Sequence, residues 1–153
     1  MSSNHFKRGE LYSMLNGIAS LALVRRMQKN FRAAGLEITI EQWGILYHLW
    51  KEDELSQQEL CIRSFKDKPS ITRLVDNLEK QKFVERKGSE TDRRINKICL
   101  TESGKNLQDQ TIEIANQTMD EALVGVHKED IETVRMVLQT VYNNLNPEPV
   151  KLN

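Results

Sequence analysis

One stretch of the chain, residues 68–81, combines apolar side chains with small polar and basic ones. The apolar residues have the i, i+3, i+4 and i+7 spacing of a buried helix face: Ile71, Leu74, Val75 and Leu78. The other face of a helix over residues 69–81 would be small and polar, with Lys68 and Pro69 at its start, and would carry Ser70, Thr72, Arg73, Asp76 and Asn77. Ser70, Thr72, Arg73 and Asn77 offer hydrogen-bond donors and acceptors of suitable size. Such groups can bond to base edges in the major groove of DNA, where a guanidinium engages both acceptors of a guanine. The pattern predicts a base-reading helix with Arg73 as its main determinant of preference.

A second polar group lies between two short β-rich runs, residues 83–87 and 95–100, which predict a two-stranded hairpin. Arg93 and Arg94 at its tip could reach a minor groove, where narrow A·T tracts concentrate negative potential. Asp92 could pair with one of these guanidinium groups and hold it extended. Further side chains suit contacts with phosphates that are independent of sequence: Ser56, Gln57, Lys66, Lys68, Arg86, Lys87 and Lys97.

The distribution of charge agrees with these assignments. The chain has 22 basic and 22 acidic side chains and no net charge. Residues 62–100 nevertheless hold 11 basic and 6 acidic side chains, whereas residues 101–153 hold 4 and 9. A basic run is often only a solvated surface, but here it coincides with the predicted helix and hairpin. The middle third is therefore the segment suited to a polyanion.

Several helices are expected to position these groups, because prolines occur only at positions 69, 147 and 149. Thr39 can cap a helix over residues 40–50, and Ser56 with Glu59 has the spacing of a capping box for a short helix ending near Ser64. Pro69 suits the first turn of the next helix. Long helices with wide apolar stripes are predicted over residues 6–34, 102–124 and 128–145. Such wide stripes indicate that these helices pack against something besides their own small domain.

The composition argues against other classes of protein. A hydrophobic fraction of 39% with 29% charged residues is too apolar for a disordered chain and too polar for a membrane protein. No signal-peptide pattern is present, so a cytoplasmic location is expected. Cys61 and Cys99 form neither a CxxC pair nor a cluster with histidines, and no nucleophile–base pair is apparent. We expect no metal, no cofactor and no enzymatic activity.

Taken in order, several motifs give the chain a specific resemblance. They are Ile38 and Thr39 with Gln42 and Trp43, LSQQEL at 55–60, KPSITRLVDNLE at 68–79, FVER at 83–86, DRR at 92–94, and Leu100, Thr101 and Gly104. With these motifs the chain resembles the MarR (multiple-antibiotic-resistance regulator) family of bacterial transcription factors over nearly its whole length.

The resemblance implies a mainly α fold with a two-stranded β-wing, in which residues 38–100 form a winged helix-turn-helix lobe. Residues 6–34 and 102–145 would then be the dimerisation helices of a homodimer. It also implies a repressor of a pseudo-palindromic operator that a small aromatic or phenolic effector releases. Tyr12 and Trp43 are the candidates for the effector pocket, although apolar stripes of this kind are more often core or interface.

Peroxide-sensing members carry a reactive cysteine on the first helix, where this chain has Tyr12 and Ser13. Thiol sensing of that type is therefore not expected. The competing hypothesis is an interaction module that kept the winged fold and lost DNA binding. Binding to a partner protein without affinity for any duplex would favour it, whereas the retained Lys87 and Arg94 speak against it.

Overall fold

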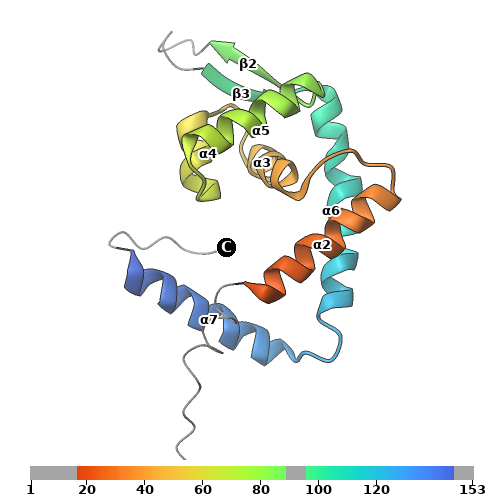
Figure 1. The fold of residues 1–153 in the computed structure, drawn as a ribbon, viewed down its shortest axis with the longest axis vertical. Coiled ribbons are helices and arrows are strands. Elements are labelled where there is room, and N and C mark those ends of the chain that lie inside the picture. Colours follow the sequence, from red (N-terminus) through yellow and green to blue (C-terminus); the bar gives the residue numbers. More distant parts are fainter. Residues whose placement is uncertain (1–16, 89–95, 147–153) are drawn as a thin grey trace, which may run out of the picture. The chain divides into compact units, whose positions relative to one another are not determined.

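The computed structural model describes residues 17–88 and 96–146 of the chain. In chain order its elements are α2 (Ile18–Ala33), α3 (Ile40–Lys51), β1 (Leu55–Ser56), α4 (Gln57–Ser64), α5 (Lys68–Lys80), β2 (Val84–Gly88), β3 (Asn96–Leu100), α6 (Glu102–Ala122) and α7 (Lys128–Leu145) (Figure 1). The chain divides into two compact units, Met1–Met119 and Asp120–Asn153. The mainly helical fold with a winged helix-turn-helix is thus confirmed. Residues 6–16 of the predicted first helix lie outside the described ranges.

Side-chain caps explain where the helices of the first unit begin. Thr39 and Gln42 form a capping box at the start of α3, and Ser56 and Glu59 form one at the start of α4. Both caps were predicted from the sequence. At α5 the Asp67 carboxylate accepts a 2.7 Å hydrogen bond from the backbone nitrogen of Ser70, so this helix begins one residue earlier than the proline suggests.

The wing consists of the antiparallel strands β2 and β3, with Val84 opposite Leu100 and Lys87 opposite Lys97. The predicted hairpin is confirmed. A third strand, β1, pairs with the other edge of β3, which gives the order β1-β3-β2. The sequence did not indicate β1, because a strand of two residues is too short to show alternation.

The core of the winged lobe lies where α3, α4, α5 and the sheet meet. The predicted inward face of α5, which consists of Ile71, Leu74, Val75 and Leu78, is buried together with Ile45, Leu46, Leu49, Leu55, Leu60, Val84, Ile98 and Leu100. Each large aliphatic side chain removed from water contributes about 1.5–3 kcal/mol. A smaller cluster of Met27, Phe31, Ile38 and Ala115 packs α2 against α6. The polar face of α5 is consequently fixed outward.

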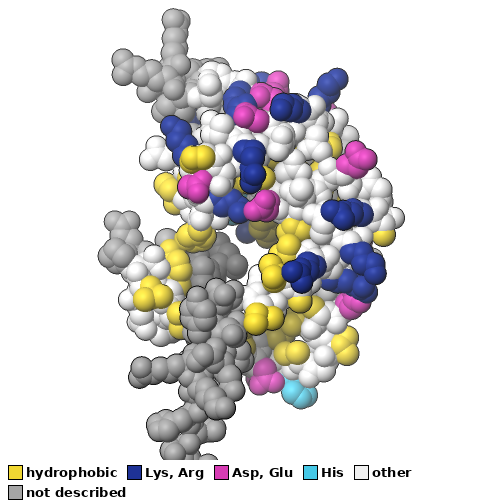
Figure 2. All heavy atoms as spheres, viewed as in Figure 1, with side chains coloured by type: hydrophobic (Ala, Val, Ile, Leu, Met, Phe, Trp, Pro, Cys, Tyr) yellow, Lys and Arg dark blue, Asp and Glu magenta, His cyan; other side chains and the backbone are white. Residues whose placement is uncertain are grey.

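Two helices leave apolar side chains uncovered. On α7, within the second unit, no residue is buried, and Val134, Val137 and Leu138 are exposed. On α2, within the first unit, Ile18 and Leu21 are exposed. Figure 2 shows hydrophobic side chains at the surface of both helices. No helix in the described ranges is long and apolar enough to cross a membrane.

Candidate nucleic-acid interface

The exposed face of α5 forms a shallow groove. It is lined by Lys68, Pro69, Thr72, Arg73, Asp76, Asn77 and Lys80, which include five of the six residues predicted to make up the DNA-binding part of this helix. The sixth, Ser70, is half-buried and its backbone nitrogen is engaged by Asp67. Lys68, Arg73 and Asn77 are exposed. Neither Lys68 nor Arg73 has an ion pair within residues 17–88 and 96–146, so these cations are available to a ligand.

One side-chain hydrogen bond joins α4 to α5, and a second within α5 holds its acceptor in place. The Gln57 side chain donates to the hydroxyl of Thr72 at 3.0 Å, and that hydroxyl donates to the backbone oxygen of Lys68 at 2.9 Å. Gln57 was predicted to contact phosphate and Thr72 to contact a base. In the structure they connect the two helices of the helix-turn-helix.

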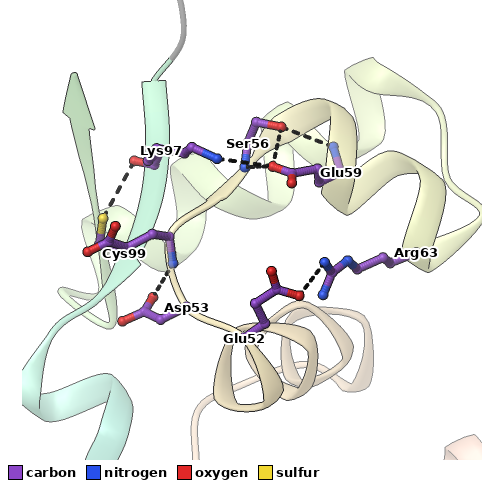
Figure 3. A network of polar contacts seen from close by, with 8 residues as sticks. Glu52, Asp53, Ser56, Glu59, Arg63, Lys97 and Cys99 are labelled. Atoms are coloured by element: carbon purple, nitrogen blue, oxygen red, sulfur yellow. Dashed lines mark hydrogen bonds and ion pairs between the residues drawn. The ribbon is translucent and has the colours of Figure 1, made fainter. Parts of the chain in front are cut away.

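A polar network joins the start of α4 to the wing (Figure 3). Both the backbone nitrogen and the hydroxyl of Ser56 donate to Oε2 of Glu59 at 2.7 Å, and Nζ of Lys97 lies 3.3 Å from the same oxygen. These hydrogen bonds from Ser56, supported by Lys97, lower the pKa of Glu59 to about 2. Ser56 and Lys97 were predicted to contact phosphates, and here they hold β3 against the start of α4.

The loop that follows α3, which carries Glu52 and Asp53, is anchored to the same strand, β3 (Figure 3). Oδ1 of Asp53 accepts a 2.9 Å hydrogen bond from the backbone nitrogen of Leu100 in β3. Glu52 forms a 2.5 Å ion pair with Arg63 of α4. The segment between α3 and α4 is therefore tied both to the sheet and to the helix that follows.

The predicted wing residues Arg86 and Lys87 lie on β2 in different environments. The Arg86 guanidinium contacts Asp76 at 2.6 Å and Glu79 at 2.5 Å, both on α5. Burial opposes its charge, but the hydrogen bonds and negative charge of these two carboxylates outweigh it, so the pKa of Arg86 is raised. Lys87 is exposed and pairs with Glu85 at 2.9 Å; that contact raises its pKa.

The remaining predicted residues divide into those described and those not. Lys66 forms a 3.1 Å ion pair with Glu41 of α3. Asp92, Arg93 and Arg94, which were predicted for the wing tip, and the effector candidate Tyr12 lie outside the described ranges.

The other effector candidate, Trp43, lies against Phe31, with ring centroids 6.1 Å apart, and against Tyr47 at 5.4 Å. Its Nε1 atom is buried and has no hydrogen-bond acceptor among residues 17–88 and 96–146. A buried donor without an acceptor costs free energy, because it has lost its hydrogen bonds to water. Trp43 is therefore both a core side chain and a potential donor to a bound acceptor.

Sequence reasoning missed two contributors to this surface, since Lys80 lines the α5 groove and Asp67 caps the helix. Asp76 lies on the outward face as expected, and its pairing with Arg86 is a further contact that was not foreseen. An aspartate just before a helix that has proline in its first turn is an N-cap signature, and it identifies Asp67 without a structure. Nothing in the sequence pairs Asp76 with Arg86.

Neither cysteine belongs to a reactive cluster in the described residues. Cys99 is buried on β3, and burial raises the pKa of its thiol, whereas Cys61 on α4 is half-buried. No three His, Cys, Asp or Glu side chains within the described ranges gather as metal ligands would.

Comparison with known proteins identifies the family. Residues 35–95 match the model described as MarR family. This segment is a MarR-family domain. The resemblance recognised in the sequence motifs is thereby confirmed.

Solved structures share the fold of this chain beyond the matched segment. The transcriptional regulator PA3341 is 27% identical and has a TM-score of 0.76, with 90% of this chain and 99% of that chain covered. A cysteine-to-serine mutant of Escherichia coli MarR complexed with operator DNA has a TM-score of 0.80 at 21% identity, covering 91% and 99%. Reduced AbfR bound to DNA has a TM-score of 0.76 at 18% identity, covering 95% and 100%.

Proposed function

We propose that this chain is a transcriptional regulator that binds duplex DNA, with α5 in the major groove. The observation that carries the proposal is the outward face of α5, where Lys68, Arg73 and Asn77 are exposed on a helix fixed by a buried apolar stripe. Two structures of similar fold, those of E. coli MarR and AbfR, contain DNA. Hydrogen-bonding groups on a rigid helix are what direct reading of base edges requires.

The residues take different roles in this proposal. Arg73 and Asn77 contact bases, and Lys68 contacts the backbone beside them. Lys87 on β2 contacts phosphate from the wing, because its ammonium is exposed and its partner Glu85 lies on the solvent side of the same strand. Arg93 and Arg94 extend the contact into the adjacent minor groove, with Asp92 orienting one of them.

The regulator acts as a homodimer on two half-sites. The exposed apolar residues of α2 and of α7 are the surfaces a second copy would cover. A two-fold axis places the two copies of α5 about 10 base pairs apart, which requires a pseudo-palindromic operator. Bound there, the dimer represses transcription.

A small aromatic or phenolic effector releases the repressor. The Nε1 atom of Trp43, which finds no acceptor among the described residues, supports a site beside that ring for a ligand carrying a hydrogen-bond acceptor. Tyr12 is the second proposed lining residue. We expect such a compound to release DNA from the wild type. The same compound should not release DNA from the Trp43→Phe variant.

DNA binding is tested by measuring affinity for the sequence adjacent to the protein's own gene across a range of salt concentrations. Arg73→Gln should lower the difference in binding free energy between the preferred base and a wrong base by about 1–3 kcal/mol. Lys87→Gln should weaken binding evenly and reduce the salt slope by about 0.9. Lys105→Gln, on exposed α6 surface, is the control that should change neither. Wild-type affinity and selectivity in both test variants would refute the proposal.

A further inference from the structure

Arg86 connects the wing to α5. Its side chain is less exposed than those of Arg63, Lys66 and Lys97, the other partly buried cations of the winged lobe in the described ranges. Its backbone nitrogen donates to Oε1 of Glu79 at 3.1 Å, and its Nη1 contacts Oε2 of the same carboxylate at 2.5 Å. Its Nη2 contacts Oδ1 of Asp76 at 2.6 Å. One arginine on β2 therefore satisfies two carboxylates that lie one turn apart on α5. We call these three residues the Arg86 clamp.

The clamp borders the proposed DNA-binding groove. Asp76 lines that groove together with Lys68 and Arg73. The side chain of Asp76 is 47% exposed and that of Glu79 is 40%, whereas that of Arg86 is only 22%. The two negative groups are thus more open to an approaching ligand than the single positive group that pairs with both of them. Without Arg86 they would repel phosphates from the base-reading helix.

The geometry also bears on the expectation that Arg86 contacts phosphate. Both terminal nitrogens of its guanidinium are occupied by the carboxylates. To reach DNA the side chain would have to abandon two charge-assisted hydrogen bonds, and it would leave Asp76 and Glu79 beside the phosphate that it gained. The side chain of Lys87, the next residue, is 60% exposed, and its ion pair is with Glu85 of the same strand and not with a carboxylate of α5.

We propose that Arg86 is a positioning residue that serves as the internal counterion of α5 and makes no contact with DNA. It fixes the wing to the base-reading helix and offsets one of the two negative charges of Asp76 and Glu79, which weakens the repulsion between these carboxylates and phosphates at the outward face of α5. This inference rests on the proposed function. It adds that the two neighbouring residues have different roles. Arg86 pairs with the carboxylates of α5, and Lys87 contacts a phosphate of the DNA.

The experiment measures affinity for an operator duplex against salt concentration for the wild type, Arg86→Gln, and two double variants. Arg86→Gln/Asp76→Asn and Arg86→Gln/Glu102→Gln both restore the wild-type net charge. Only the first removes a carboxylate of the clamp, since Glu102 is an exposed residue of α6. Circular dichroism confirms that each variant is folded.

Arg86→Gln should bind roughly tenfold more weakly, the effect expected of an uncompensated charge near phosphate at an effective dielectric constant of about 20. Its salt slope should equal that of the wild type, because no phosphate contact is lost. The Asp76→Asn double variant should recover most of the affinity, and the Glu102→Gln double variant should not. A slope reduced by about 0.9 without recovery would identify Arg86 as a phosphate contact and overturn the inference. Unchanged affinity in Arg86→Gln, or equal recovery in both double variants, would overturn it as well.

A second measurement separates failure of this inference from failure of the proposed function. If the wild type binds no duplex, the proposed function is wrong. The clamp is then tested by a double-mutant cycle of Arg86→Gln and Asp76→Asn in urea unfolding. Coupled effects on stability support the structural part of the proposal, and additive effects overturn it.

Discussion

The side chain of Gln42 in α3 donates a 2.8 Å hydrogen bond from Nε2 to Oε1 of Gln81, the residue that follows α5. Nε2 of Gln81 in turn donates to the backbone oxygen of Glu37 at 2.7 Å, and Oε1 of Gln42 accepts from the backbone nitrogen of Thr39. The two amides thus fix the end of the proposed base-reading helix to the start of α3.

Removing the inner amide should loosen this connection. Gln42 is 6% exposed, so Gln42→Leu leaves the Thr39 nitrogen and the Gln81 oxygen without their partner in a partly buried region. We expect a loss of about 1–3 kcal/mol in the free energy of unfolding, measured in urea. Gln110→Leu, at an exposed position of α6, is the matched control and should change stability little. Equal losses in the two variants would contradict the role given to Gln42.

Two helical glycines should respond in opposite directions to alanine. A Cβ at Gly104 would lie 2.0 Å from the backbone oxygen of Phe83, so Gly104→Ala forces α6 away from the wing and should cost about 1–3 kcal/mol or more. A Cβ at Gly44, within α3, meets nothing within 4 Å, and Gly44→Ala should gain about 0.5–1 kcal/mol. Thermal midpoints measure both, and destabilisation by Gly44→Ala would show that the α3 surface is not open there.

The Glu59 carboxylate should make stability depend on acid pH. Its folded-state pKa of about 2 lies below the ordinary 4.5, so its stabilisation is complete above about pH 5 and disappears as the pH falls toward 2. Glu59→Gln keeps a residue that suits the capping box but cannot titrate or pair with Lys97. Urea midpoints should show the variant less stable than the wild type at pH 7, with the difference closing between pH 5 and 2. Glu102→Gln, at an exposed glutamate, should show no such convergence.

Asp67 should be required as a hydrogen-bond acceptor more than as a charge. The hydrogen bond from the Ser70 backbone lowers the pKa of this exposed carboxyl. Asp67→Asn retains an acceptor at the helix start, whereas Asp67→Ala removes it. We expect the alanine variant to lose both stability and DNA affinity, and the asparagine variant to retain stability and bind DNA at least as tightly as the wild type. Equal stability of the two variants would argue against the cap.

The proposed homodimer should depend on the apolar side chains of α7. Val134 and Leu138 are 56% and 44% exposed and lie one turn apart. Val134→Asp/Leu138→Asp should produce a monomer in sedimentation velocity, because two charges cannot be buried at a two-fold contact without partners. Thr140→Asp/Asn143→Asp adds the same charge to polar positions of the same helix and should leave the dimer intact. A dimeric Val134→Asp/Leu138→Asp protein would place the interface elsewhere.

Local patterns were sufficient to determine the framework of this protein. The spacing of Ile71, Leu74, Val75 and Leu78 predicted which face of α5 is buried, because helical period alone decides which side chains share a face. The capping boxes at Thr39 and Ser56 were predictable for the same reason, since donor and acceptor lie three residues apart. The exposed positions of Lys68, Arg73 and Asn77 follow from that framework.

The partners of the charged side chains were decided by the tertiary structure. Lys97 and Glu59 are 38 residues apart, and they meet because the start of α4 and strand β3 lie side by side. The register of β2 beside α5 likewise brings Arg86 to Asp76 and Glu79. A sequence reveals that a lysine or arginine is present, but the cation's availability to a phosphate depends on which carboxylate the fold brings within about 4 Å of it. Composition and period contain no information on that distance, because it is set by the packing of elements remote from one another in the chain.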